Sequence, residues 1–571
     1  MPLQSVFLPL SRLAAALLCT TFLFAHPATA EEPSETTAAP AAASEPFELV
    51  ILHANDAHAY AAGMTERGAP CDADEACLGG YARIAAKIKS EKAAHPHVLA
   101  LDAGDRWQGT LFFRTGGEVF IGRATNAIPW DALTLGNHEF DLGVDVLAEH
   151  LKRSTHPTLA ANIAPKAGSA LDKLPRTVFA PDRLFEFDGV KVGVFGLANS
   201  EEDSFAARAD EMAENLDFLE NIEAARTAVA RLETAGADIV IALTHQGYEA
   251  DQALAEAVRG IDVIVGGHTH SLLGEGLPGN EGPYPTVVVS PEGERTLVVQ
   301  AKRSTEYLGR LVVRFSHDGR AIDWSGAPVR LEKDLPRDPE LESIVTEAAQ
   351  DIAEFRAAYV STNHNRYADG LDACREGECL SGLLAADAFL DFARKSGAQI
   401  ALVNGGAIRS ALPVGRIDRG SILEMHPFGN RLAVIEVAGR DIVAALEHGT
   451  AEPTVDGPHL LQPAGLRYEI DPTAPVGRRI VRVEVPVADE SGTHWRAISP
   501  EKRYRVVTLD YLARGGDGFT FFARAKHLSC EPCEAERGAL DLEIFAKHLE
   551  ARDPVPMPST GRITGFGPAA Y

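Results

Sequence analysis

The stretch Leu52-His53-Ala54-Asn55-Asp56-Ala57-His58 decides the fold, because a short apolar run ends in it with residue types that bind metal ions. Further apolar runs end in the same way, in Asp102-Ala103-Gly104-Asp105, Gly136-Asn137-His138-Glu139-Phe140-Asp141, Thr244-His245 and Gly266-Gly267-His268-Thr269-His270. Side chains so far apart in the chain meet when parallel strands end at one edge of a sheet. The pattern therefore predicts a sheet with a metal site at that edge.

Apolar runs of strand length alternate with segments of helical spacing over this part of the chain. Helical spacing is found in Tyr81–Glu91 and Ile222–Thr234. The expected strands are Leu49–Leu52, Val98–Leu101, Leu133–Leu135, Val190–Leu197, Ile239–Leu243 and Val263–Val265. Strands that alternate with helices indicate an α/β layer architecture.

The candidate metal ligands combine carboxylate, amide and imidazole groups. They are Asp56, His58, Asp105, Asn137, His245, His268 and His270. Asp105 follows a glycine, and its two carboxylate oxygens can bridge two cations. Mixed nitrogen and oxygen ligands suit zinc, manganese, iron or cobalt better than calcium. Two such ions ~3.5–4 Å apart can bind both the attacking and the leaving oxygen of a phosphoryl displacement.

Each of these residues also has a structural interpretation. A single histidine at a strand end is more often a hydrogen-bonded surface residue, and Asp or Asn after a strand is often a turn former. The repetition of the pattern at several strand ends favours the metal site. His53 lies within an apolar run and is expected to be structural, and Asp102 is expected to support the ligands rather than bind metal.

His138 directly follows a candidate ligand, so its ring should project beside the metal ions. It can stabilise or protonate a leaving alkoxide as a general acid. Asp141, three residues further on, is placed to orient the imidazole. The attacking group would be a water molecule whose pKa falls on metal binding.

Length and charge restrict the possible architectures and partners. A chain of 571 residues is too long for one compact core, so two domains are expected. The formal net charge of −27 argues against a nucleic acid polymer or an anionic membrane as the main partner. A small anionic substrate stays possible, since bound cations reverse the field locally.

The first residues indicate export to the periplasm or the medium. In residues 1–30, Arg12 precedes the apolar run Leu13–Ala25, and Ala28-Thr29-Ala30 fits a signal-peptide cleavage site. Residues 31–46 are rich in Ala, Pro, Ser and Glu and are expected to be a disordered spacer. No membrane span is expected once the signal peptide is removed.

Six cysteines remain in three close pairs, which favours disulfides in an oxidising compartment. The pairs are Cys71 with Cys77, Cys374 with Cys379, and Cys530 with Cys533. A zinc site or redox activity at Cys530-Glu531-Pro532-Cys533 is the alternative.

The pattern changes near residue 336. We expect an α/β domain over residues 47–335, an interdomain helix over 336–360 and a second domain over 361–566. The amphipathic core of the interdomain helix runs from about Glu340 to Tyr359. The second domain should contain helices at Gly382–Lys395 and Asp441–His448 and strands at Ile400–Val403, Val434–Val437 and Tyr504–Leu509.

Together these segments closely resemble the 5'-nucleotidase family, whose members are exported calcineurin-like metallophosphoesterases. In the second domain the resemblance lies in Asn404-Gly405-Gly406-Ala407-Ile408-Arg409, Pro427-Phe428-Gly429-Asn430 and Gly515-Gly516-Asp517-Gly518-Phe519. It implies a four-layer phosphoesterase domain, with two mixed sheets flanked by helices, followed by an α+β nucleotide-binding domain. It also implies that Asp105 is shared by two metal ions, with His138 and Asp141 as the catalytic pair.

The resemblance further implies a set of substrate contacts. Phe428 and Tyr511 would stack on the base, Asp517 would accept from ribose hydroxyls, and Asn404 would contact the base. Arg375 and Arg409 would face phosphate or ribose. The animal enzyme has Phe where this chain has Tyr511. Disulfides Cys71–Cys77 and Cys374–Cys379 are implied as well, whereas the resemblance assigns no role to Cys530 and Cys533.

The expected activity is hydrolysis of nucleoside 5'-monophosphates to nucleoside and phosphate by metal-activated water. UDP-sugars, nucleoside di- and triphosphates and 2',3'-cyclic nucleotides are alternative substrates, because all present a phosphorus atom to the same nucleophile. A non-catalytic exported nucleotide-binding protein is an alternative of another class. The sequence leaves the base preference, the native metals and the oligomeric state open.

Overall fold

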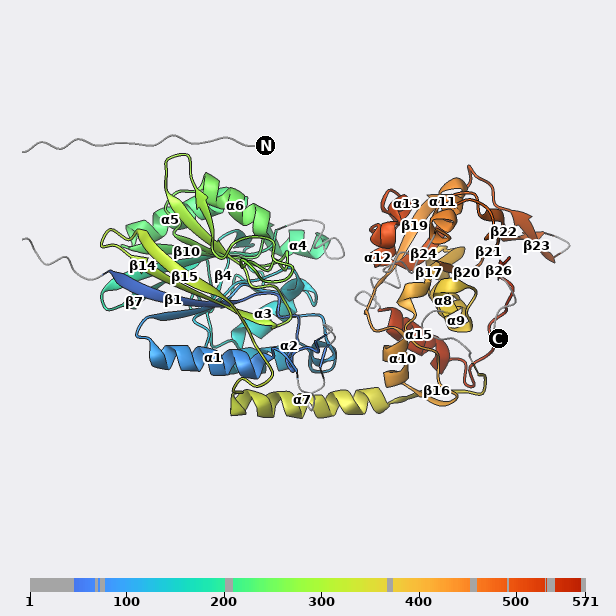
Figure 1. The fold of residues 1–571 in the computed structure, drawn as a ribbon, viewed down its shortest axis with the longest axis horizontal. Coiled ribbons are helices and arrows are strands. Elements are labelled where there is room, and N and C mark those ends of the chain that lie inside the picture. The colour runs from blue at the N-terminus through green and yellow to red at the C-terminus, as the bar shows by residue number, and fades with distance from the viewer. Residues whose placement is uncertain are drawn as a thin grey trace, which may run out of the picture. The chain divides into compact units, whose positions relative to one another are not determined.

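The structure of the protein is a computed structural model, drawn in Figure 1. The described residues are 46–66, 70–71, 77–200, 209–366, 373–451, 460–489, 492–528, 530 and 540–565. The signal peptide predicted for residues 1–30 and residues 31–45 of the predicted spacer lie outside the described residues. So does Cys533.

A seven-stranded mixed sheet contains the first group of predicted strands. Its order is β15-β14-β1-β2-β3-β4-β6. Strands β1, β2, β3, β4 and β6 are parallel, and β14 and β15 are added antiparallel. The bounds are β1 Phe47–Ala54, β2 Val98–Asp102, β3 Ala132–Leu133, β4 Thr158–Leu159, β6 Phe179–Ala180, β14 Tyr307–Phe315 and β15 Ala321–Arg330.

A six-stranded sheet contains the second group, in the order β12-β13-β11-β10-β8-β7. Its central strands β8, β10, β11 and β13 are parallel. The bounds are β7 Asp182–Phe187, β8 Val190–Leu197, β10 Ile239–Thr244, β11 Val263–Val265, β12 Thr286–Val289 and β13 Arg295–Val299.

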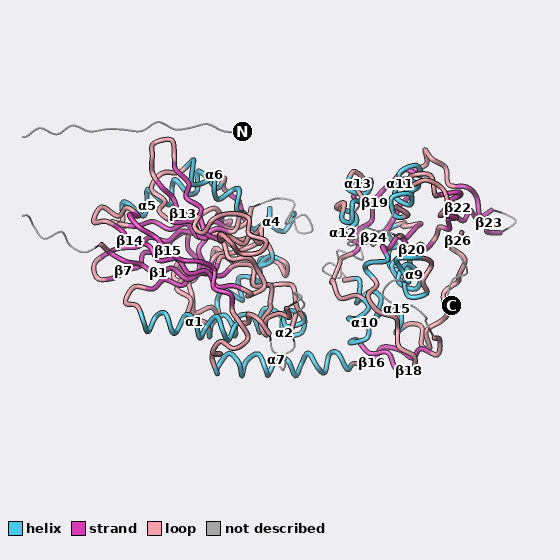
Figure 2. Tube along the Cα trace, in the orientation of Figure 1, coloured by secondary structure: helices cyan, strands magenta, loops and turns pink. Residues whose placement is uncertain are grey.

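The two sheets pack face to face between outer helices. In β1, Leu49 and Ile51 face the core between the sheets, whereas Val50 and Leu52 face the outer helices. Helices α1, α2 and α3 cover the seven-stranded sheet, α7 packs on α1 and α2, and α5 and α6 cover the other sheet (Figures 1 and 2). Their bounds are α1 Tyr81–Ala94, α2 Leu111–Ala127, α3 Val144–Lys152, α5 Asn221–Thr234, α6 Tyr248–Ala257 and α7 Pro339–Ala357. The expected four-layer architecture is confirmed.

Among its described residues, the C-terminal part has a two-stranded sheet of β16 (Tyr359–Asn363) and β18 (Gly415–Asp418) and two larger sheets, of order β20-β17-β24-β19-β25 and β23-β22-β21-β26. Their strands are β17 Ile400–Asn404, β19 Leu432–Ala438, β20 Leu461–Ala464, β21 Arg467–Ile470, β22 Ile480–Asp489, β23 Gly492–Ala497, β24 Arg503–Leu509, β25 Lys526–Leu528 and β26 Ile563–Thr564. Its helices include α8 Ala373–Glu376, α9 Leu380–Ala393, α10 Arg419–Met425, α11 Gly439–Gly449, α12 Asp510–Ala513, α13 Thr520–Ala523 and α15 Asp541–Glu550. The expected α+β class is confirmed.

Several predicted element bounds were wrong, among them the end of β3 and the end of α7. Strand β3 ends at Leu133, because Thr134 and Leu135 already belong to the loop that leads to the next candidate ligands. Helix α7 ends at Ala357, and Tyr359 begins strand β16 (Tyr359–Asn363) instead of ending the helix. Among the described residues, no helix is both long and apolar enough to cross a membrane.

Candidate active site

Most of the predicted metal ligands have a backbone conformation that is rare for their residue types. The positive φ angles are 52° at Asp56, 45° at His58, 57° at Asp105, 79° at His268 and 59° at His270. Each residue lies just after β1, β2 or β11. A non-glycine residue in the left-handed region costs of order 1–3 kcal/mol and persists only where its surroundings hold it there. Clustering of this strain at strand ends marks a functional site.

Asp105 lies at the centre of the ligand cluster. Candidate ligand atoms within 4.8 Å of one another form three groups: Asp56, His58 and His270; His58, Asp105 and His138; and Asp105, His245 and His268. Asp105 Oδ2 lies 3.3 Å from His245 Nε2 and 3.9 Å from His58 Nε2. Asp105 therefore connects the two ends of the cluster.

The polar atoms of the cluster fit a pair of divalent cations. Asn137 Oδ1 and His245 Nε2 are buried and have no hydrogen-bond partner among the described residues. Both are atoms through which these side chains bind a metal ion. His245 Nδ1 lies 2.6 Å from the carbonyl of Ala103, an arrangement that fixes the ring and leaves Nε2 for a metal. The nitrogen and oxygen donors suit a transition metal.

His138 and Asp141 form the predicted pair. His138 Nδ1 lies 3.0 Å from Asp141 Oδ2, and the amide of His138 donates to Asp105 Oδ1 over 3.0 Å. Burial alone would lower the pKa of His138, but the hydrogen bond with Asp141 and the charge of Asp105 raise it to about 9. The pair lies directly beside the candidate metal ligands.

Glu139 is a supporting residue to which the sequence analysis assigned no role. Its side chain is fully buried. Its carboxylate accepts from the amides of Gly136 over 2.7 Å, Asp105 over 3.0 Å and Arg106 over 2.7 Å. One side chain thus joins the loops after β2 and β3, which carry Asp105 and Asn137. The sequence places Glu139 within the loop of candidate ligands, but its contacts with Asp105 and Arg106 depend on the fold.

The two residues expected to be structural lie as predicted. His53 is fully buried within β1, and its Nε2 lies 2.8 Å from the hydroxyl of Tyr284. Asp102 accepts from Arg106 over 2.6 Å and from the amide of Gly104 over 3.0 Å. Asp102 therefore holds the backbone that leads to Asp105.

The expected disulfides Cys71–Cys77 and Cys374–Cys379 are present. Cys530 is also disulfide-bonded, and Cys533 lies outside the described residues.

The structure brings the predicted substrate residues of the C-terminal part together in connected sets. Asn404 Nδ2 donates to Asp517 Oδ2 over 2.8 Å, and the hydroxyl of Tyr511 donates to Asp517 Oδ1 over 2.8 Å. The guanidinium of Arg409 lies 5.3 Å from the ring centre of Phe428. Burial, followed by the charge of Arg375, lowers the pKa of Arg409. Two guanidinium groups that repel one another in this way favour the binding of an anion.

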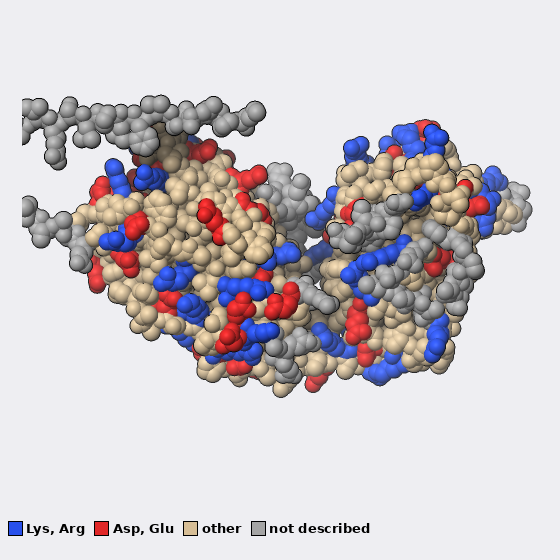
Figure 3. Space-filling view, viewed as in Figure 1, with Lys and Arg blue, Asp and Glu red and all other residues tan. Residues whose placement is uncertain are grey.

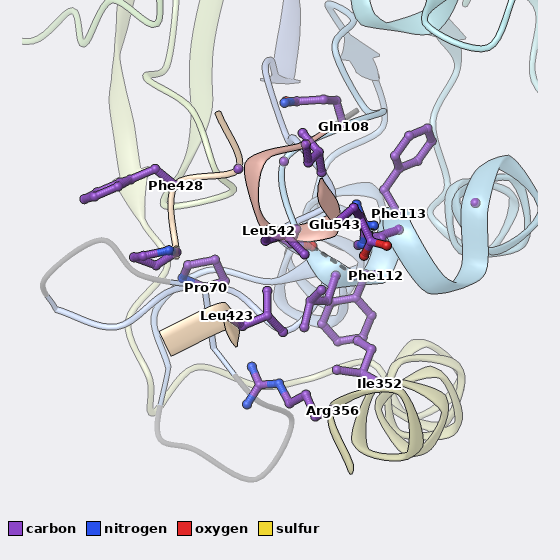
Figure 4. A pocket seen from close by; sticks show the side chains of 18 of the residues that line it. Pro70, Gln108, Phe112, Phe113, Ile352, Arg356, Leu423, Phe428, Leu542 and Glu543 are labelled. Carbon is purple, nitrogen blue, oxygen red and sulfur yellow. Dashed lines mark hydrogen bonds and ion pairs between the residues drawn. The ribbon is translucent and has the colours of Figure 1, made fainter. Parts of the chain in front are cut away.

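A cavity of about 880 Å³ is lined both by Asp141 and by Phe428. Gln108 and Arg431 line it as well, and Figure 4 shows Phe428 and Gln108 among its side chains. Arg431 lies 3.8 Å from Asp141. A volume of several hundred Å³ is typical of small-molecule sites. The cavity can therefore hold a ligand that contacts both Asp141 and the ring of Phe428.

Family models match both parts of the chain. The model described as calcineurin-like phosphoesterase matches residues 49–272, and the model described as 5'-nucleotidase, C-terminal domain, matches residues 357–524.

Three similar proteins cover almost the whole length. The 5'-nucleotidase of Bos taurus is 31% identical over 523 residues, which are 89% of this chain and 89% of the bovine protein. The snake venom 5'-nucleotidase of Crotalus adamanteus is 32% identical over 531 residues, with 90% and 88% covered. The crystal structure of the 5'-nucleotidase precursor from Thermus thermophilus has a TM-score of 0.59 and 33% identity, with 91% of this chain and 100% of that chain covered.

Proposed function

Because this chain belongs to the 5'-nucleotidase family and is a phosphoric monoester hydrolase, we propose that it converts nucleoside 5'-monophosphates to nucleoside and phosphate. The observation that carries the proposal is the position of Asp105. Its carboxylate belongs to two groups of candidate ligand atoms, one with His58 and His138 and the other with His245 and His268. A shared carboxylate between two cation sites is what a dimetal phosphoesterase requires.

Seven side chains would hold the two metal ions. The first ion would be held by Asp56, His58, Asp105 and His270, and the second by Asp105, Asn137, His245 and His268. When bound, a pair of zinc, manganese or cobalt ions supplies Lewis acidity and lowers the pKa of a water nucleophile. The buried atoms Asn137 Oδ1 and His245 Nε2, which make no hydrogen bond among the described residues, support this assignment.

His138 would transfer a proton to the departing nucleoside oxygen. Asp141 accepts from His138 Nδ1, which leaves Nε2 as the atom that delivers the proton. The main chain of His138 is held by Asp105, so the general acid keeps a fixed position beside the reacting phosphate. This role contributes typically about 10²–10⁴-fold to the rate.

The C-terminal residues would bind the nucleoside. Phe428 and Tyr511 would stack on the base, which is worth ~1–3 kcal/mol per base. Asp517 would accept from ribose hydroxyls, and Asn404 would contact the base. Both aromatic side chains are accessible, with 58% of Phe428 and 47% of Tyr511 exposed.

Arg375 and Arg409 would face the phosphate or the ribose. The chain carries a net charge of −27, and charges of both signs are interspersed on the face drawn in Figure 3. The binding of an anionic substrate therefore depends on such local cations.

We also place the protein in the periplasm or outside the cell. The disulfides Cys71–Cys77 and Cys374–Cys379 support this location, because disulfides persist in oxidising compartments.

The proposal is tested by phosphate release from AMP, ATP, UDP-glucose and cyclic AMP. The wild-type protein should prefer AMP, lose activity after chelation and regain it with Zn²⁺, Mn²⁺ or Co²⁺. Exposed His317→Ala is a matched control for histidine substitutions at the site and should behave as wild type. Preference for another member of the panel would assign that substrate instead, and no hydrolysis under any metal would refute enzymatic activity.

A further inference from the structure

The hydroxyl of Tyr511 is bonded to the residue that we place at the ribose. It donates to Asp517 Oδ1 over 2.8 Å and accepts from the amide of Asp517 over 3.2 Å. The other carboxylate oxygen, Oδ2, accepts from Asn404 Nδ2 over 2.8 Å. Both oxygens of an accessible carboxylate are therefore oriented by the protein itself.

The ring of Tyr511 is held at the same time. A Cβ atom added to Gly516 would lie 2.5 Å from Tyr511 Cζ, so one face of the ring lies against the backbone of Gly516. The ring is 47% exposed, which leaves its other side accessible to a base. Two hydrogen bonds at one end and the contact with Gly516 leave the ring little rotational freedom.

Asp517 is held in an unfavourable backbone conformation. Its φ angle is 51°, in the left-handed region that an aspartate adopts only at a cost. Its carbonyl lies 2.8 Å from His448 Nε2, which fixes the same residue from a third direction. Asp517 is not part of a hydrophobic core, so strain held at this side chain indicates a binding role.

We propose that the Tyr511 hydroxyl positions Asp517, so that the stacking surface for the base and the acceptor for the ribose form one preassembled unit. This inference rests on the proposed function. A carboxylate has about four acceptor positions. Tyr511 and Asn404 each use one, and the others stay available to ribose hydroxyls. A preassembled acceptor loses less conformational freedom when the ligand binds.

The chemistry of the phenol suits this role. Its hydrogen bond with Asp517 raises the pKa of Tyr511, so the hydroxyl stays a protonated donor at neutral pH. A phenylalanine at this position would keep the ring and its contact with Gly516 but lose both hydrogen bonds. The hydroxyl is therefore a feature that can be removed on its own.

The test compares AMP with 2',3'-dideoxy-AMP, which lacks the ribose hydroxyls. In Tyr511→Phe the KM for AMP should rise roughly three- to tenfold, the effect of one or two hydrogen bonds. The KM for 2',3'-dideoxy-AMP should rise much less. Tyr359→Phe is the matched control, because Tyr359 is 45% exposed and its hydroxyl donates to Asp553 Oδ2 over 2.6 Å away from these residues.

A double-mutant cycle separates positioning from a general loss of structure. If Tyr511 acts through Asp517, Tyr511→Phe should have little further effect on the KM for AMP in an Asp517→Asn background. If Tyr511→Phe alone lowers stability, the cycle still tests whether Tyr511 acts through Asp517. Asp517→Asn keeps the size of the side chain, so it changes the acceptor without changing the volume.

Several results would overturn the inference. A lower KM for AMP in Tyr511→Phe would show that the hydroxyl competes with ribose for Asp517. An equal rise for both substrates would show that it only holds the ring, and an unchanged KM would show that it has no role. Absence of AMP hydrolysis in the wild type would instead refute the proposed function.

Discussion

At the scale of single residues, the site depends on two carboxylates with different tasks. Asp105 lies among the candidate metal ligands, whereas Glu139 accepts from the amides of Gly136, Asp105 and Arg106. The first would provide ligand atoms, and the second fixes the backbone that presents them. Loss of either should weaken metal binding, but for different physical reasons.

His138→Ala should lower kcat by about 10²–10⁴-fold, because the departing oxygen loses its proton donor. The metal content should stay at the wild-type level, since the ligands Asp105 and Asn137 are unchanged. Steady-state kinetics together with elemental analysis measure both quantities. Unchanged turnover in this variant would exclude His138 from the mechanism.

Glu139→Gln should weaken metal binding by about 10–100-fold, the usual effect of changing a group that supports the ligands. The side-chain NH₂ group of the new glutamine would meet backbone N–H groups that now donate to a carboxylate. Calorimetric titration of the metal-free protein measures the affinity. Glu149→Gln, at an exposed position on α3, is the control. Equal metal affinity in the two variants would contradict the role of Glu139.

At the scale of elements, the bounds predicted from the sequence were most accurate where the apolar residues of a run are also buried in the structure. The runs that became β8, β11 and β24 were predicted to within a residue, because most of their apolar side chains are buried in a core. The end of β3 and the end of α7 were missed, because apolar residues such as Leu135 continue beyond the last residue of the element.

The positions of the candidate ligands could be predicted from the sequence, but not the way they are held. The residue types after β1, β2 and β11 were sufficient to expect a metal site. The left-handed backbone at Asp105 and the bonds of Glu139 depend on contacts between loops that are distant in the chain. The Tyr511–Asp517 bond was equally hidden, because it depends on how the turn after α12 folds back onto that helix.

The start of α15 contains a buried pair that should make stability depend on pH. Asp541 is fully buried, with Oδ2 3.9 Å from His426 Nδ1 and 3.3 Å from Asn430 Nδ2. Burial raises the pKa of Asp541 to about 7 and lowers the pKa of His426 to about 3. Both groups are therefore neutral between these values.

The folded pKa of Asp541 lies above the value of about 4 in an unfolded chain. Protonated Asp541 therefore makes its full contribution to the stability of the folded protein below about pH 4. This contribution is lost as the pH rises to about 7. Asp541→Asn should remove this decline, which is on the order of 2–4 kcal/mol. Thermal unfolding from pH 4 to pH 8 measures it, with exposed Asp145→Asn as control. Parallel pH profiles of Asp541→Asn and wild type would contradict the assignment.

At the scale of the whole molecule, two differently built parts carry different sets of candidate site residues. The four-layer part gathers the candidate metal ligands at strand ends, and the α+β part presents aromatic and guanidinium groups. A strongly anionic chain that acts on an anionic substrate must concentrate cations locally. Bound divalent ions, with Arg375 and Arg409, would meet that need.

Metal binding should also stabilise the folded protein, because the ligands converge only in the folded state. Chelation should therefore lower the thermal midpoint of the wild type, and restoring Zn²⁺, Mn²⁺ or Co²⁺ should raise it again. Calorimetry before and after chelation measures the shift. An unchanged midpoint in protein freed of metal would contradict a folded-state metal site.

The most direct test of the central claim is the number of metal ions per chain in the wild type and in Asp105→Asn. If Asp105 serves two ions, elemental analysis should find two per chain in the wild type, at most one in Asp105→Asn, and two in His138→Ala. Two tightly held ions in Asp105→Asn, or active wild-type protein free of transition metal, would contradict the account.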